Sequence, residues 1–211
     1  MYLLSKALVF PPVNLANEDG LLAVGGDLSA ERLLLAYKNG IFPWYNQGEP
    51  IVWYSPDPRM VLFPKNLNIS KSMKQIIRKN KFRATFNQNF SEVISNCKNS
   101  YREGQGGTWI TDEMEQAYIN LHKLGVAKSV EVWEGNELVG GLYGIDLGHV
   151  FCGESMFSKK SNASKFAFIY LVQKLEKENY KLIDCQIYNE HLASLGAEEI
   201  SRETFLTYLK K

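Results

Sequence analysis

Three polar residues in the last third of the chain have the types and spacing for chemistry: Glu154, Asp184 and Gln186. Glu154 interrupts the apolar run VFCGESMF, and the other two close the run LIDCQ. A carboxylate buried alone costs several kcal/mol, so each acid in such a run needs a partner. Two acids and an amide over one cleft could bind a cationic or amino-terminal group and hold an amine for attack. A satisfied polar network inside the core would explain the same residues, and this alternative stays open.

Strand geometry determines which of these side chains can meet. Residues two apart in a strand share a face, so Asp184 and Gln186 are expected to point the same way. The same rule places Cys152, Glu154 and Met156 on one face. If the two strands are neighbours, Glu154 meets the other two polar groups across one cleft.

The elements around these runs predict an α+β fold. The stretches KSVEVWE, ELVGGLYGID and HVFCGESMF are typical of an antiparallel meander, and a long helix and the strand KLIDCQ follow. This order differs from a Rossmann alternation and resembles the N-acetyltransferase-like (GNAT) fold, whose central sheet opens around the cofactor. The turn SKKSNA before the long helix has no glycine to let backbone amides approach a phosphate. That absence argues against a usual acyl-CoA enzyme.

The chain divides into two expected domains. Residues 1–57 are rich in turns and predict a small, loop-rich N-terminal domain. One helix is clear there, because Ser29 can cap the periodic stretch AERLLLAYKN. Residues 58–211 form the second domain, in which Ser70 and Thr111 are expected to cap further helices.

Charge is unevenly distributed along the chain. The formal net charge is +1, yet the stretch from Pro58 to Ser91 contains eight Lys or Arg residues and no Asp or Glu. Such segregation favours a polyanionic partner with salt-dependent phosphate contacts. One solvated basic helix would give the same pattern, and charge alone does not separate the two interpretations.

Composition narrows the class of protein. Hydrophobic residues make up 45 % of the chain, enough for a core, and no apolar run approaches the roughly 20 residues of a membrane span. Three cysteines without CxxC spacing and three scattered histidines predict neither a zinc site nor a disulfide framework. We expect a cytoplasmic protein that holds no metal and does not associate with a membrane.

Several aromatic residues lie in turn-rich or glycine-rich stretches: Trp44, Trp53, Tyr54 and Trp109. An aromatic ring in a loop can stack on a nucleic-acid base, or it can fix the loop to the core, which is the commoner use. Trp109 follows the glycines of GQGG and is the best candidate for stacking.

Six stretches closely resemble the leucyl/phenylalanyl-tRNA–protein transferase family: GLLAVGGDLSAERLLLAYKNGIFPWY, WYSPDPRMVL, GTWIT, ELVGGLYG, FCGESMFSKKSNASK and LIDCQIYNEHLASLGA. They follow in order from about Gly20 to Ala197. The family takes Leu or Phe, and also Met, from aminoacyl-tRNA and joins it to the N-terminal Arg or Lys of an acceptor protein. That addition marks the acceptor for N-end rule degradation. The resemblance implies a small N-terminal domain, a GNAT-like C-terminal domain, no metal and no cofactor.

The resemblance also implies roles by position. The residues expected around the terminal adenosine of the tRNA are Tyr37, Trp44, Trp109, Tyr118 and Asn189. The pocket for the Leu or Phe side chain would consist of Leu142, Phe168, Leu171, Leu175 and Ile183. The tRNA-binding face would consist of Lys71, Lys74, Arg78, Lys79, Lys81 and Arg83. The catalytic centre would consist of Glu154, Asp184 and Gln186. The chemistry of these residues suggests roles for them: Asp184 would polarise or orient Gln186, which holds the amine against the ester. Glu154 would bind the amino group of the aminoacyl moiety or the cationic end of the acceptor. Asp184, water and the ribose stay open as the final proton acceptor.

The sequence departs from the family pattern at two places. Tyr54 stands where many members have a tryptophan, and Leu142 stands where a methionine is common. Two other functions stay open. A GNAT-type acyltransferase would bind acyl-CoA, whereas a non-enzymatic tRNA- or N-degron-binding module would bind tRNA or peptide without forming a product.

Overall fold

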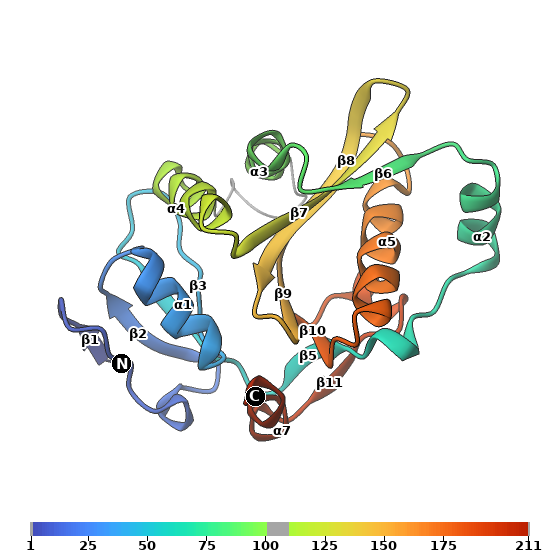
Figure 1. Cartoon of the computed structure of the whole chain (residues 1–211). Helices are drawn as coiled ribbons and strands as arrows, with labels where there is room; N and C mark the ends of the chain where they lie inside the picture. The colour runs from blue at the N-terminus through green and yellow to red at the C-terminus, as the bar shows by residue number, and fades with distance from the viewer. Residues whose placement is uncertain (1, 101–109, 211) are drawn as a thin grey trace.

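The structure, a computed structural model, describes residues 2–100 and 110–210, which contain two β-sheets (Figure 1). The first sheet has the strand order β1-β2-β4-β3. The elements of this N-terminal unit are β1 (Tyr2–Leu4), the 3-10 helix η1 (Val13–Leu15), β2 (Leu21–Gly25), α1 (Ala30–Lys38), β3 (Phe42–Pro43) and β4 (Val52–Tyr54). β1 runs parallel to β2, and the other neighbouring strands are antiparallel.

The N-terminal unit contains short strands in addition to the one α-helix that the sequence predicts. The helix is confirmed, with the Ser29 side chain accepting the backbone N–H of Arg32 at its start. The turn-rich composition does not predict the strands, because they are two to five residues long. Trp53 on β4 is fully buried, and its Nε1 donates to the Gly25 carbonyl at 2.8 Å. This tryptophan therefore fixes its segment to the core.

The second sheet has the strand order β11-β5-β10-β9-β8-β7-β6. Its strands are β5 (Arg59–Leu62), β6 (Arg83–Phe86), β7 (Ala127–Glu134), β8 (Glu137–Asp146), β9 (Val150–Ser158), β10 (Leu182–Gln186) and β11 (Glu198–Ile200). The helices between and after them are η2 (Pro64–Asn66), α2 (Lys71–Arg78), α3 (Phe90–Lys98), α4 (Asp112–Lys123), α5 (Ala163–Lys177), α6 (Glu190–Ala193) and α7 (Arg202–Leu209). The meander β7-β8-β9 is antiparallel, and α5 leads to β10, which pairs with β9 in parallel. The predicted α+β class is confirmed.

Helices cover both faces of the second sheet (Figure 1). α3 and α4 pack on one face, and α5 packs on the other together with Met73 of α2. Ser70 and Thr111 cap α2 and α4 as predicted. The buried cluster on the α3 and α4 face continues into the N-terminal unit through Leu33 and Trp53. The two sheets therefore share a core, and the division of the chain at residue 57 stays a prediction.

β9 and β10 pair over a short distance and then separate. Their last ladder pair joins Asp184 to Cys152, although both strands continue beyond it. β9 has an extra residue at Glu154 in its pairing with β8, and β10 has an extra residue at Cys185 in its pairing with β5. Such β-bulges bend a strand and re-aim its side chains. The sheet consequently opens at the level of Glu154 and Gln186, as expected of an N-acetyltransferase-like fold.

The two bulges overturn the predicted alternation of side chains. Cys152 packs into the buried cluster of the α4 face, whereas Met156 packs with α5 on the opposite face. Asp184 and Gln186 lie opposite consecutive residues of β5, so they also belong to opposite faces. The prediction that each set shares a face is wrong, because one extra residue reverses the alternation beyond it.

Candidate functional site

The opening between β9 and β10 leads into a cavity of about 440 Å³. Its walls are β8 and β9, the cavity-facing side of α5, the segment from β10 into α6, and residues 42–44 of the N-terminal unit. The predicted site residues that line it are Trp44, Leu142, Glu154, Phe168, Leu171, Ile183, Asp184, Gln186 and Asn189. Residues from both sheets therefore contribute to one site.

The apolar part of the cavity contains most of the residues predicted for the side-chain pocket, namely Leu142, Phe168, Leu171 and Ile183. Met156, which lies opposite Leu142 in the ladder between β8 and β9, also lines the cavity and was not predicted. Leu175 differs from the expectation. It lies one turn beyond Leu171 on α5, is 2 % exposed and packs in the core outside the cavity lining.

The polar part centres on Glu154 and Gln186, which meet across the gap between the strands. Gln186 Nε2 donates to Glu154 Oε1 at 2.7 Å. Gln186 has a φ of 68°, in the left-handed region that residues other than glycine rarely adopt. The two side chains lie together as the sequence suggested, but bulges rather than regular strands bring them there.

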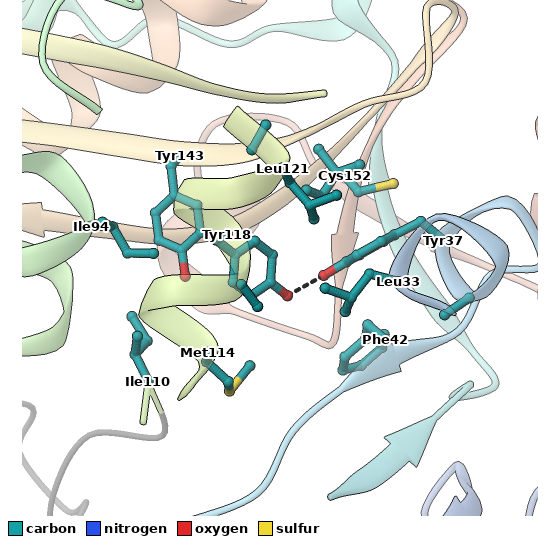
Figure 2. Packing of buried hydrophobic residues seen from close by; sticks show 14 of the residues in the cluster. Leu33, Tyr37, Phe42, Ile94, Ile110, Met114, Tyr118, Leu121, Tyr143 and Cys152 are labelled. Carbon is teal, nitrogen blue, oxygen red and sulfur yellow. Dashed lines mark hydrogen bonds between the residues drawn. The ribbon is translucent and has the colours of Figure 1, made fainter. Parts of the chain in front are cut away.

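Two buried tyrosines continue the hydrogen bonding behind Glu154. Tyr118 from α4 donates to Glu154 Oε2 at 2.9 Å, and the hydroxyls of Tyr37 from α1 and Tyr118 are hydrogen-bonded (Figure 2). Because Tyr118 uses its one proton on Glu154, Tyr37 is the donor to Tyr118. Both tyrosines are at most 2 % exposed and lie outside the cavity lining, and their place near the adenosine stays a prediction.

The surroundings of Glu154 change its protonation. Burial raises the pKa of its carboxyl from 4.5 to about 8, against the opposing effect of hydrogen bonds from Tyr118 and Gln186. Burial and the charge of Glu154 raise the pKa values of both tyrosines well above 10.0, so the hydroxyls stay protonated donors. A carboxyl with a pKa of about 8 can take up and release a proton near neutral pH.

Asp184 has a cationic partner, the buried Arg59. Arg59 donates from Nε to Asp184 Oδ1 at 2.8 Å and from Nη2 to Oδ2 at 2.7 Å. Both side chains are 1 % exposed. Asp184 Oδ1 also accepts the backbone N–H of Gln186 at 2.9 Å. Asp184 therefore orients Gln186 through the main chain, while Arg59 holds its carboxylate in place.

Residues near the rest of the cavity form a mixed aromatic and polar rim. Trp44 is half-buried and lines the cavity, and its ring centroid is 5.8 Å from that of Tyr54. Asn189 also lines the cavity, and its Oδ1 accepts the backbone N–H of Leu192 at the start of α6. Trp109, the other tryptophan expected at the adenosine, lies outside the described residues.

The six cations predicted to bind tRNA lie on α2 and on the segment leading into β6, and all are exposed. Figure 1 shows α2 far from the N-terminal unit, beyond α5. Lys81 lies 3.8 Å from Glu134, and Arg83 lies over the Trp133 ring. Arg59 belongs to the same basic stretch of sequence, but it is buried and contributes nothing to this surface.

Sequence reasoning missed Arg59, Met156 and His191. His191 lines the cavity, and its buried Nε2 has no hydrogen-bond partner among the described residues. A signal for Arg59 was present, because a cation next to the apolar run MVLF must find a partner if that strand is buried. Within residues 2–100 and 110–210, no cluster of His, Cys, Asp and Glu could hold a metal ion, and no helix is long and apolar enough to cross a membrane.

Comparison with known proteins identifies the family. A family model described as leucyl/phenylalanyl-tRNA protein transferase matches residues 61–210, and the model of the N-terminal domain of these proteins matches residues 26–57. The chain is 67 % identical to a protein of Flavobacterium johnsoniae named leucyl/phenylalanyl-tRNA–protein transferase, over 100 % of this chain and 99 % of that protein. It is 54 % identical to a protein of the same name from Pseudomonas fluorescens, over 100 % of this chain and 93 % of that protein.

Solved structures are more distantly similar. A GCN5-related N-acetyltransferase from Kribbella flavida is 11 % identical with a TM-score of 0.42, over 85 % of this chain and 63 % of that chain. L-PGS from Bacillus licheniformis is 13 % identical with a TM-score of 0.42, over 82 % of this chain and 57 % of that chain. The assignment therefore depends on the family models and the full-length relatives. On that evidence, the chain belongs to the leucyl/phenylalanyl-tRNA protein transferase family.

Proposed function

We propose that the cavity beside β9 and β10 is where this transferase moves Leu or Phe, and also Met, from aminoacyl-tRNA to the N-terminal Arg or Lys of an acceptor protein. The observation that carries this proposal is one cavity with an apolar part and, at the opening of the sheet, the hydrogen-bonded pair Glu154 and Gln186. The apolar part takes the side chain of the transferred amino acid. The polar part receives its ester and the attacking amine.

The reaction needs no energy source, because the aminoacyl ester is already activated. The acceptor α-amine attacks the ester carbonyl, a C–N bond forms, and the ester C–O bond to the ribose breaks. Gln186 Nε2 donates to Glu154, and the amide oxygen, the acceptor of this side chain, accepts an N–H of the incoming amine. Gln186 thereby places the amine, and the amine must shed a proton as the new bond forms.

Glu154 is the group suited to take that proton. Its carboxyl pKa of about 8 is close to that of an α-amino group, ~7.7–8.0, so proton transfer between them is nearly balanced. The leaving ribose oxygen then takes a proton from Glu154, which restores the carboxylate. Asp184 is unsuited to this role, because both of its oxygens accept hydrogen bonds from the buried Arg59.

Other residues are assigned to contacts with the tRNA and with the side chain of the transferred amino acid. Trp44 at the cavity contacts the terminal adenosine, and the exposed cations of α2 contact the tRNA backbone without reading its sequence. The apolar walls admit Leu, Met and Phe, whereas a β-branched side chain collides near Cα at a cost of about 1–3 kcal/mol. The degradation of the tagged acceptor and a cytoplasmic location, where charged tRNA is found, complete the proposal.

A direct test is mass spectrometry of a peptide that begins with Arg, after incubation with the protein and Leu-tRNA. The expected product carries one additional leucine residue. The same peptide with an acetylated N-terminus should stay unchanged, and Ile-tRNA should react at least about tenfold more slowly. Binding without any product would instead indicate a tRNA- or N-degron-binding module. Equal transfer of isoleucine would contradict the assigned pocket.

The basic face has its own prediction. Lys74→Glu combined with Arg78→Glu should weaken binding of different charged tRNAs alike, by about tenfold or more at low salt, because phosphate contacts are lost. A minimal aminoacyl-adenosine substrate should react as before. The exposed pair Lys6→Glu with Lys123→Glu, on other surfaces, is the matched control. Equal loss with tRNA and with the minimal substrate would remove α2 from the tRNA interface.

A further inference from the structure

Arg59 has an unusually complete set of partners for a buried residue. Its Nε and Nη2 form the two-point contact with Asp184, and its Nη1 donates to the Gly40 carbonyl at 3.2 Å. Its guanidinium carbon lies 4.8 Å from the ring centroid of Phe42 and 4.7 Å from that of Phe205. A planar guanidinium can lie against two aromatic rings and donate two hydrogen bonds to a carboxylate at the same time. The ammonium group of lysine cannot form this set of contacts.

These partners come from three separate parts of the chain. Gly40 and Phe42 belong to the N-terminal unit, Phe205 lies on α7, and Asp184 lies on β10. Arg59 itself begins β5, the strand that pairs with β10 and β11. Arg59 therefore links the N-terminal unit and the C-terminal helix α7 to β10 through direct contacts.

A short chain of hydrogen bonds leads from Arg59 to the polar centre. Asp184 Oδ1 accepts from Arg59 Nε and also from the backbone N–H of Gln186 at 2.9 Å. That second bond holds Gln186 at its positive φ of 68°, which an L-residue adopts only when its surroundings impose it. The Gln186 side chain then donates to Glu154 at 2.7 Å.

We propose that Arg59 is a positioning residue for aminoacyl transfer: it fixes Asp184, and Asp184 fixes the main chain that aims the Gln186 amide at Glu154. This inference rests on the function proposed above. Arg59 touches neither the cavity nor a reacting atom, so its effect passes through Asp184. A small misplacement of a positioned amide costs far more in turnover than in substrate affinity, because the apolar pocket stays intact.

The first test is Arg59→Lys, which keeps the charge and removes the two-point contact. We expect kcat for leucine transfer to fall about 10- to 100-fold, while KM for Leu-tRNA changes less than about threefold. Activities are compared per folded molecule, with folding measured by circular dichroism. Unchanged kcat, or a loss confined to KM, would overturn the positioning role.

Arg32→Lys is the matched control. Arg32 is also fully buried, pairs with Asp27 at 3.2 Å and donates to the Ser5 carbonyl, but it lies outside the cavity lining. Both variants lose stability, so a merely structural role predicts equal behaviour. We expect the Arg32 variant to keep the wild-type kcat. An equal fall in kcat for both variants would count against the proposal.

A double-mutant cycle tests whether Arg59 acts through Asp184. If it does, Arg59→Gln with Asp184→Asn should be no slower than the slower single variant, because both changes interrupt one path. A double variant slowed by the product of the two single effects would overturn the inference. If the Arg59 variants fail to fold, Phe205→Leu takes their place, with an expected fall in kcat of about two- to fivefold. Wild-type kcat in that variant would overturn the inference equally.

The same assay separates failure of this inference from failure of the proposed function. Wild-type protein that adds no leucine to the Arg-initiated peptide refutes the proposed function. Active wild type together with an equally active Arg59→Lys variant refutes only the role of Arg59.

Discussion

Two carboxylates lie on neighbouring strands at the open end of the second sheet, and their partners differ in charge. Asp184 on β10 is fixed by the guanidinium of Arg59. Glu154 on β9 accepts hydrogen bonds from the neutral groups of Tyr118 and Gln186. A buried cation fixes the position of the Asp184 carboxylate, whereas burial among neutral donors favours the protonated form of Glu154. The difference separates a residue that holds the site from a residue that can move a proton within it.

The largest expected effect breaks the charged pair. Asp184→Asn leaves Arg59 buried without a counter-charge and should lower the free energy of unfolding by about 3–5 kcal/mol, measured by urea denaturation. Glu178→Gln is the control, because Glu178 and its partner Lys174 on α5 are both partly solvent-exposed, and this change should cost about 1 kcal/mol or less. An equal decrease in the free energy of unfolding for the two variants would mean that the buried Asp184 pair stabilises the fold no more than an exposed pair does.

The opposite carboxylate should affect turnover instead of folding. Glu154→Gln removes the proposed proton acceptor and should lower kcat about 100-fold, without lowering the free energy of unfolding at pH 7. Glu131→Gln is a matched control: Glu131 is fully buried and accepts from the hydroxyls of Thr85 and Ser129, away from the cavity. If Glu154→Gln kept the wild-type kcat, a group other than Glu154 would accept the proton of the attacking amine.

The pH dependence of stability sharpens the contrast. The folded pKa of Glu154, about 8, lies above the unfolded value near 4.5, so the folded state binds the extra proton between these values. Its contribution to stability is fully present below pH 4.5 and is lost as pH rises through 8. We expect the Tm of wild type to fall relative to that of Glu154→Gln between pH 5 and 8, by several degrees at about 2–4 °C per kcal/mol. A constant Tm difference would contradict the raised pKa.

The smallest expected effect concerns the donors behind Glu154. Tyr118→Phe removes a hydrogen bond that lowers the pKa of Glu154, so this pKa should rise further. The rising limb of kcat against pH should then move to higher pH by about one unit or less, with a loss of a few-fold at pH 7.5. Tyr180→Phe, which removes a tyrosine–carboxylate bond to Asp146 outside the cavity, should leave the limb in place. If the kcat–pH profile of Tyr118→Phe matched that of wild type, the tyrosines would have no influence on the proton transfer by Glu154.

Much of this protein follows from local sequence. Ser29, Ser70 and Thr111 each cap the helix that the pattern predicts, because a cap depends on a hydroxyl and a backbone N–H three residues away. The meander, the long helix and the strand KLIDCQ that follows it are likewise readable from periodicity. The family resemblance rests on contiguous stretches of sequence, and four of the five residues that it implies for the side-chain pocket line the cavity.

Tertiary structure alone decided how the polar centre is made. Arg59 and Asp184 are 125 positions apart, and no local pattern pairs them. The bulges at Glu154 and Cys185 arise from pairing with neighbouring strands, so a rule of strict alternation assigned the wrong faces. Leu175 lies on the same helical stripe as the pocket residues, but the cavity ends before it, and Leu175 packs in the core. Periodicity records which residues prefer burial, whereas the register between distant strands determines which of them meet.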